Sequence, residues 1–184
     1  GYTAVRFDTS GVGDSRTPRG AAPYADQAVL DITAVMDHLE SKYGLKQFAL
    51  FGICSGANRS YDMARVDPRV VGIFMFDGYA YPTLRMHLIQ YALRTRKLTL
   101  RRLPAALVRH TLRVLSRPFS ALHRQQPAEA QLAAAIQPRR EQYANAMQAI
   151  VDRGVNVAML YSGSVFLEYS YANQLRDAFR GHRF

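Results

Sequence analysis

The sequence lacks the features that define a membrane-spanning or disulfide-stabilised protein. Its 184 residues include a single cysteine, which excludes an internal disulfide bond. No stretch approaches the roughly 20 apolar residues of a membrane span. The chain begins Gly-Tyr-Thr-Ala-Val, with neither an initiator methionine nor a secretory leader. These absences predict a soluble protein in a reducing compartment, the cytoplasm, and a chain that enters in the middle of a fold.

Acidic residues are scarce, above all in the middle of the chain. There are 14 Asp and Glu against 24 Lys and Arg, a formal net charge of +10, and no acid occurs from Gly78 to Ala128. The basic residues of this segment are Arg85, Arg94, Arg96, Lys97, Arg101, Arg102, Arg109, Arg113, Arg117 and Arg124. Four of them fall at helical spacing among apolar residues, which predicts one or two basic amphipathic helices: Arg102, Arg109, Arg113 and Arg117.

Apolar residues make up 48% of the chain, enough for one substantial core. Continuous apolar or β-rich runs alternate with segments in which apolar residues recur every three or four positions. This alternation predicts a mostly parallel sheet in an α/β fold. The β-rich runs cover about 2–7, 47–51, 70–76 and 155–161, and the helical segments about 24–43, 55–65, 138–154 and 169–179.

A cysteine between two glycines follows the second of these runs. The order is an apolar strand, then Gly52-Ile53-Cys54-Ser55-Gly56, then a segment compatible with a helix. A nucleophile elbow has this order, because its raised nucleophile occupies a strained turn between small neighbours. The glycines place Cys54 at the raised position, and Ser55 is the alternative, although it requires the β-branched Ile53 at a small-residue position. A buried structural cysteine beside a glycine turn is the competing interpretation.

The loop before the first helix contains two glycines that also occur in nucleotide-binding turns. Gly11 and Gly13 follow the first β-rich run. A dinucleotide fingerprint needs a third glycine three residues later and a helix that begins at once, whereas Arg16 occupies that position and the helix begins well after it. We therefore expect the loop, with Asp8 and Ser15, to be structural, its polar side chains bonding turn amides.

Two stretches of sequence carry a resemblance to a known family. They are Val-Arg-Phe-Asp-Thr-Ser-Gly-Val-Gly-Asp-Ser and, after a helix, Leu-Phe-Gly-Ile-Cys-Ser-Gly-Ala. Both resemble the central part of the α/β-hydrolase superfamily. The Cys-Ser-Gly-Ala turn and a later Asp-Gly-Tyr-Ala-Tyr-Pro-Thr segment are similar to bacterial serine-aminopeptidase-like hydrolases, including those associated with exopolysaccharide and exosortase systems. The resemblance implies a partial α/β-hydrolase fold, with core parts at 1–78 and 138–184 and a helical basic lid at 79–137.

Acyl transfer at Cys54 would need a thiolate, oxyanion donors, an acid and a histidine. The following helix favours the thiolate through its dipole and free amides, and the Ser55 amide is an expected oxyanion donor. The resemblance implies a second donor from an earlier strand, outside this chain. No carboxylate comes directly after the strand ending at Tyr161, so Glu168 and Asp77 are both candidates for the acid. Either carboxylate could instead bond only a loop amide.

The resemblance places the catalytic histidine one strand beyond the last predicted helix, so we expect it beyond the C-terminus. His182 is near that place in sequence but lies on no rigid element. His38 is predicted on the surface or packed face of a helix, and the others fall in the insertion: His87, His110 and His123.

The basic insertion has several interpretations. As a lid it would steer anionic substrates toward the nucleophile. A basic amphipathic helix is also typical of peripheral contact with an anionic membrane, and the charge could simply be a solvated face. Nucleic-acid binding is disfavoured because no binding motif surrounds the arginines.

These expectations give a hydrolase that acts on an ester, thioester or amide of a small molecule by acyl transfer, without a metal or organic cofactor. Without its histidine, this chain alone is expected to be inactive. The alternative is a non-catalytic or truncated relative that binds a hydrophobic or anionic partner. Neither the substrate nor the oligomeric state follows from the sequence.

Overall fold

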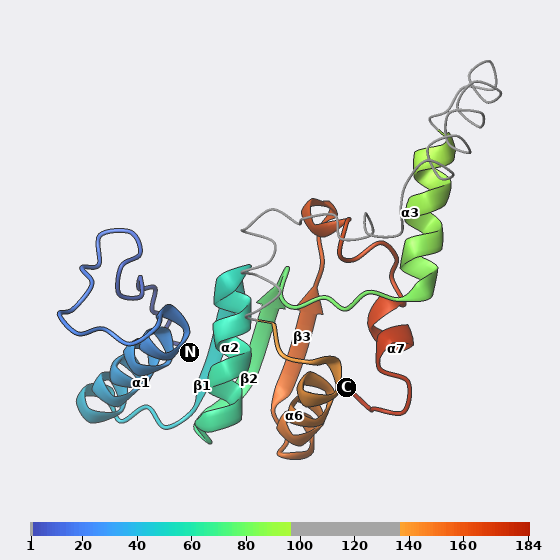
Figure 1. Cartoon of the computed structure of the whole chain (residues 1–184). Helices are drawn as coiled ribbons and strands as arrows, with labels where there is room; N and C mark the ends of the chain where they lie inside the picture. The colour runs from blue at the N-terminus through green and yellow to red at the C-terminus, as the bar shows by residue number, and fades with distance from the viewer. Residues whose placement is uncertain (1, 97–136) are drawn as a thin grey trace. The chain divides into compact units, whose positions relative to one another are not determined.

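The computed structural model describes residues 2–96 and 137–184 (Figure 1). The chain divides into two compact units. The first contains Gly1–Ala80, Glu141–Val165 and Gly181–Phe184, and the second contains Tyr81–Arg140 and Phe166–Arg180. Most of the arginines of the predicted basic helices, together with His110 and His123, lie outside the described residues. The boundaries of the lid therefore stay a prediction.

The first unit is built on a parallel three-stranded sheet in the order β1-β2-β3 (Figure 1). Its strands are β1 (Phe48–Ile53), β2 (Val70–Phe76) and β3 (Asn156–Leu160). The register pairs the last residues of the three strands with one another, so all three carboxyl ends lie at the same edge. The parallel sheet with its flanking helices confirms the predicted α/β fold, and its carboxyl edge is where open α/β sheets place ligands.

One helix precedes the first strand and another follows it. Helix α1 (Tyr24–Tyr43) buries Ala28, Ile32 and Met36, which share one face at helical spacing. It ends at Gly44, whose left-handed backbone at φ 68° lets its amide donate to the carbonyl of Glu40. Helix α2 (Ser55–Val66) packs on β1 and β2.

Three tyrosines form the centre of the first unit. Tyr61 of α2 stacks on Tyr143 of α6 (Arg140–Asp152), with ring centroids 4.8 Å apart, and both side chains are fully buried. The ring of Tyr79 meets each of them edge-on at 5.9 Å. Offset and edge-to-face pairs of this kind add to the stability gained from burial alone. The cluster therefore joins α2, α6 and the segment after β2.

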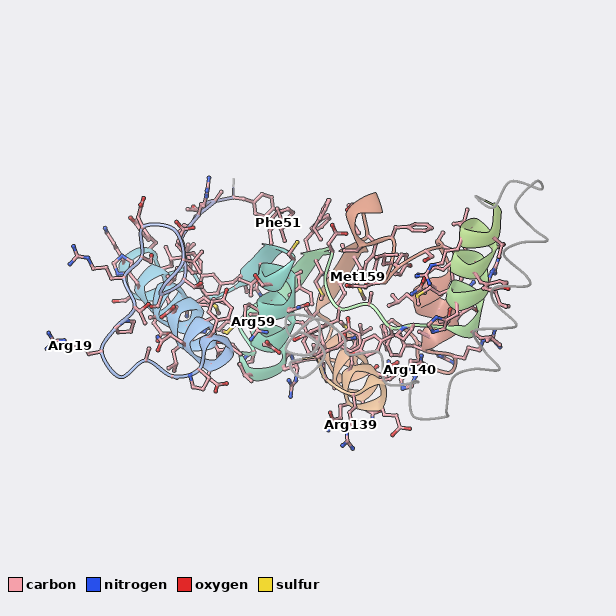
Figure 2. All side chains as sticks on the ribbon, turned by 45° about the horizontal axis from the view of Figure 1, so that its top comes forward. Arg19, Phe51, Arg59, Arg139, Arg140 and Met159 are labelled. Atoms are coloured by element: carbon pink, nitrogen blue, oxygen red, sulfur yellow. The ribbon has the colours of Figure 1, made fainter. Side chains whose placement is uncertain are left out.

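Charged side chains form a network just before β2. Arg69, just before β2, bonds the carboxylate of Asp67 at 2.7 Å and those of Glu40 and Asp37 of α1 at 2.7 and 2.8 Å. The hydrogen bond from Arg69 holds the pKa of Asp67 below its ordinary value. One guanidinium thus links α1 to the turn between α2 and β2. Within α2, Arg59 forms a buried ion pair with Asp62 at 3.0 Å (Arg59 is labelled in Figure 2).

One face of the sheet carries exposed aromatic side chains. Phe51 of β1 stacks on Phe74 of β2 with ring centroids 5.0 Å apart, and Phe51 remains 66% exposed (Figure 2). Gly52 and Phe48, at the alternate positions of β1, are buried. The strand therefore has the two-residue alternation of a sheet that is covered on one side.

The second unit contains α3 (Leu84–Arg96) and the short α7 (Gln174–Ala178). Its centre is Gln174, which is 1% exposed. The amide nitrogen of Gln174 donates to the carbonyl of Tyr81 at 3.0 Å, and its amide oxygen accepts from the backbone of Ser170 at 2.8 Å. These bonds tie the segment before α3 to the segment before α7.

Two expected elements differ from the structure. The β-rich run at 2–7 forms no strand, and its apolar side chains Tyr2, Val5 and Phe7 are exposed. A strand is stabilised by pairing with a neighbour, and this run pairs with none of the described strands. The final helix is limited to α7 instead of covering 169–179, because the residues before Gln174 make turns. None of the described helices is long and apolar enough to cross a membrane.

Candidate active site at the carboxyl edge of the sheet

Cys54 lies in a sharp turn between β1 and α2. Its backbone has φ 52° and ψ −115°, a conformation that a residue with a side chain rarely adopts. Its amide donates to the carbonyl of Phe76 at 2.8 Å, which extends the β1–β2 ladder to the turn. The thiol is exposed. The turn thus holds Cys54 at the surface, so the competing interpretation of a buried structural cysteine is wrong.

The close approach of strand and helix explains the first glycine of the motif. A Cβ at Gly52 would overlap the carbonyl group of Gly56 and lie 2.5 Å from the amide nitrogen of Ala57. A Cβ at Gly56 would meet nothing within 4 Å. We expected small residues on both sides of Cys54, and this expectation is wrong for Gly56. The backbone of Gly56 lies against β1, but a side chain at Gly56 would point away from the contact.

The start of α2 presents backbone amides beside Cys54. Ser55 is the first residue of the helix and is exposed, and Gly56 is the second. The carbonyl of Cys54 accepts from the amides of Ala57 and Asn58 at 3.0 and 3.3 Å. The first amides of a helix have no carbonyl one turn back, so they and the helix dipole favour a negative charge at this end. Such amides are able to stabilise an anionic oxygen.

Asp77 directly follows β2 and is held by Ser162, the second residue after β3. Its backbone also has a positive φ, 53°, and its amide donates to the carbonyl of Leu160 at 2.8 Å. The buried carboxylate accepts hydrogen bonds from the amide and the hydroxyl of Ser162, both at 2.6 Å. Nothing in the sequence pattern pointed to Ser162 as a partner of this carboxylate. Two donors on one residue fix the orientation of this carboxylate.

Cys54 and Asp77 occupy equivalent places on neighbouring strands. The register pairs Ile53 with Phe76, and each of the two residues comes next in its own strand. Among the described residues other than glycine, these two are the ones with positive φ. Backbone strain of this kind concentrates at functional sites. The structure therefore brings Cys54, Ser55 and Asp77 together at one edge of the sheet.

The other candidate residues lie on other segments of the chain. Glu168 belongs to the second unit, and its side chain is exposed. Of the histidines within the described residues, His38 lies on α1, His87 on α3 and His182 near the C-terminus, and all three are exposed. The ring of His182 lies against Phe184, with centroids 5.8 Å apart. No general base is assigned from these positions.

The glycine-containing loop before α1 is held by α1 itself. The amide and hydroxyl of Ser10 donate to the carboxylate of Asp31 at 2.6 and 3.0 Å, and Gln27 donates to it at 2.8 Å. Burial raises the pKa of Asp31, but the bonds from Ser10 and Gln27 outweigh it and leave that pKa below its usual value. Ser15 donates to the carbonyl of Asp8 at 2.9 Å. These contacts give the loop a structural role.

In the part of the chain that the structure describes, no group of three or more His, Cys, Asp or Glu side chains is arranged to hold a metal ion. A family model described as serine aminopeptidase, S33, matches residues 1–164. Searches of the curated proteins and of the solved structures found no match.

Proposed function

Because the chain belongs to the serine aminopeptidase S33 family of the α/β-hydrolase superfamily, we propose that it hydrolyses an ester, thioester or amide by acyl transfer through Cys54. The family makes it a hydrolase of the α/β-hydrolase type with a small-molecule substrate. The observation that carries the finer proposal is the strained backbone of Cys54 between β1 and α2. A nucleophile elbow gives its nucleophile this conformation, and here a thiol stands where the family name implies a serine.

The reaction follows from the groups around the turn. The sulfur of Cys54 attacks the carbonyl carbon of the substrate, a C–S bond forms, and the displaced electron pair moves to the carbonyl oxygen. The backbone amide of Ser55 donates to that oxyanion. The oxyanion then collapses, the bond to the leaving group breaks, and the leaving group takes up the proton that the Cys54 thiol has lost, which releases an alcohol, thiol or amine. Water then hydrolyses the resulting thioester in a second step, which restores the thiol and gives the carboxylic acid.

Asp77 is the acid that we propose for this site. Its support is its place at the end of β2 beside Cys54, and the two hydrogen bonds from Ser162 that orient its carboxylate. The acid of a triad holds a histidine in the productive orientation, which requires a carboxylate that is itself fixed. Glu168, exposed and in the second unit, is the alternative. The histidine is left unassigned.

The net charge of +10 supports an anionic substrate. Positive charge raises the encounter rate of anions, and the effect falls with ionic strength. We also propose that the insertion over 79–137 acts as a lid, with peripheral contact to an anionic membrane as its alternative. The two differ in one measurement: only membrane contact predicts co-sedimentation with vesicles that contain phosphatidylserine.

The acyl-transfer proposal is tested by trapping the acyl group. The full chain is incubated with p-nitrophenyl butyrate at neutral pH, and the adduct is located by peptide mapping. We expect a butyryl thioester on Cys54 that forms about a hundredfold faster than on free N-acetylcysteine at the same pH, because the backbone amide of Ser55 donates to the oxyanion. Ser55→Ala should retain the adduct, because its backbone amide remains, and Cys54→Ala should lose it.

Acylation at the rate of free N-acetylcysteine would overturn the catalytic role of Cys54 and would favour the non-catalytic binding protein. An adduct on Ser55 would move the nucleophile by one residue. Asp77→Asn and Glu168→Gln separate the two acids where a histidine couples the acid to Cys54, because only the variant that removes the true acid should then slow acylation.

A further inference from the structure

The second unit contains a cavity that the proposed chemistry does not use. It has a volume of about 580 Å³, within the range of small-molecule sites. Every residue that lines it belongs to the second unit, so it is independent of the turn at Cys54. The lining residues are Pro82, Thr83, Leu84, Arg85, Leu88, Arg140, Tyr171, Asp177 and Arg180.

Positive charge is in excess in this cavity. Its lining includes three arginines, Arg85, Arg140 and Arg180, and one acid, Asp177. Asp177 accepts a hydrogen bond from the hydroxyl of Tyr171 at 2.8 Å and pairs with Arg180 at 3.2 Å. The bonds from Tyr171 and Arg180 hold the pKa of Asp177 below its usual value, so it is ionised near neutral pH. One carboxylate therefore leaves two positive charges uncompensated.

The three guanidinium groups are held in place by their neighbours. The guanidinium of Arg85 lies over the ring of Tyr171, 4.8 Å from its centroid, which leaves the N–H groups at its edge as donors. Tyr171 is fixed in turn by a 2.9 Å hydrogen bond with Thr83. Arg140, labelled in Figure 2, donates one N–H to the carbonyl of Pro82. Each guanidinium has five donors, so none of these contacts exhausts it.

The start of α3 adds a further source of positive potential. Thr83 precedes this 13-residue helix, and its hydroxyl oxygen accepts from the amide of Met86 at 3.2 Å. Leu84 and Leu88, both largely exposed, and Pro82 give the cavity an apolar wall. Cations, a helix start and an apolar wall thus surround one volume.

We propose that this cavity binds a small organic oxyanion, in which a carboxylate or phosphate is attached to a compact apolar group. Planar guanidinium groups match both oxyanions through paired hydrogen bonds, and the oxyanion occupies the space between Arg85, Arg140 and Arg180. The apolar group lies against Leu84 and Leu88. This site goes beyond the proposed hydrolysis, because none of its residues takes part in the acyl-transfer step.

Titration calorimetry on the full chain tests the site with benzoate and phenyl phosphate as probes and benzyl alcohol as their neutral counterpart. We expect both anions to bind at low ionic strength and benzyl alcohol not to bind. Comparison of the two anions separates a carboxylate site from a phosphate site. Arg85→Gln and Arg180→Gln should each weaken binding about tenfold, since each removes a charged hydrogen bond.

Arg176→Gln is the matched control, because Arg176 is an exposed arginine of α7 that does not line the cavity. It should bind the anions as the wild type does. Leu88→Glu adds a carboxylate to the cavity at an exposed position and should abolish binding without unfolding the chain. Any one of three results would overturn the proposal. They are a weakening by Arg176→Gln equal to that by the cavity variants, binding of benzyl alcohol as tight as that of benzoate, and unchanged anion binding in Leu88→Glu. Cys54→Ala should bind the anions as the wild type does. The anion site can therefore be confirmed or overturned independently of the acyl-transfer proposal.

Discussion

Gly52 at the end of β1 packs against the backbone of Gly56 in the first turn of α2, with no room for a Cβ between them. The contact is between main-chain atoms on both sides, so no change of rotamer relieves it. The strained conformation of Cys54 between the two glycines is the geometric result of that approach.

Gly52→Ala is expected to destabilise the first unit by about 3 kcal/mol or more, because the added methyl group forces β1 and α2 apart. Gly56→Ala is the matched control and should be neutral or up to about 1 kcal/mol stabilising, since alanine is the better helix residue and its Cβ meets nothing. Urea denaturation monitored by circular dichroism measures both. Equal loss of stability in the two variants would contradict the close approach of the strand and the helix.

Asp77→Asn should lower the free energy of unfolding by about 1–2 kcal/mol, because the amide has a single oxygen to accept the two hydrogen bonds from Ser162. Asparagine tolerates positive φ, so this substitution isolates the carboxylate from the backbone strain. Ser162→Ala should cost about 1 kcal/mol, since the amide donor remains. Ser41→Ala, at an exposed position of α1, is the control, and a loss in Ser41→Ala as large as in Ser162→Ala would argue against the tether.

Arg69→Gln is expected to destabilise the chain by about 1 kcal/mol at neutral pH, a modest value because the network is partly exposed to solvent. The pKa of Asp67 is depressed in the folded state, so its contribution is present above the ordinary value of 3.8 and is lost as the pH falls through the folded value. Urea denaturation at about pH 7 and at about pH 3 should therefore show the difference between variant and wild type shrinking in acid.

Arg65→Gln is the control for this network, because Arg65 is half exposed and lies 3.8 Å from Asp62. It should change stability by less than about 0.5 kcal/mol. A difference between Arg69→Gln and wild type that grows toward acid pH would contradict the depressed pKa of Asp67.

Tyr61→Phe should be neutral or slightly stabilising, because the buried hydroxyl of Tyr61 has no hydrogen-bond partner among the residues that the structure describes. Tyr61→Ala should cost about 3–5 kcal/mol through the cavity left at the tyrosine cluster. Burial raises the pKa of Tyr61 from 10.0 to about 12. Because the folded state holds this proton more tightly, the wild type should lose stability relative to Tyr61→Phe as the pH rises from 10 to about 12. Urea denaturation measures the difference in stability between the two proteins. A difference that stays constant across that pH range would contradict the burial of this hydroxyl.

Regular periodicity predicted the elements of the first unit well. The helix at 24–43 and the strand at 70–76 have the expected bounds, because a one-sided apolar stripe with a glycine stop and a continuous apolar run are local signals. The run at 2–7 has the composition of a strand but no paired neighbour among the described strands. Pairing is a long-range property, and composition does not encode it.

The site was predictable in part. The spacing of Gly52 and Cys54 placed the turn, since the motif is contiguous in sequence. The tether between Asp77 and Ser162 joins positions 85 residues apart, and serine carries no sequence signal for such a role. The cavity in the second unit likewise depends on Arg85, Arg140 and Arg180 converging from three segments, which a one-dimensional pattern of arginines does not reveal.

The positive φ angles at Cys54 and Asp77 limit what evolution or a library can place there. Glycine enters positive φ at little energetic expense, whereas valine, isoleucine and threonine are disfavoured there by their branched Cβ. A selection for folding alone would therefore drift toward glycine at both positions. Retention of a thiol at one and a carboxylate at the other would then be the mark of selection for chemistry over foldability.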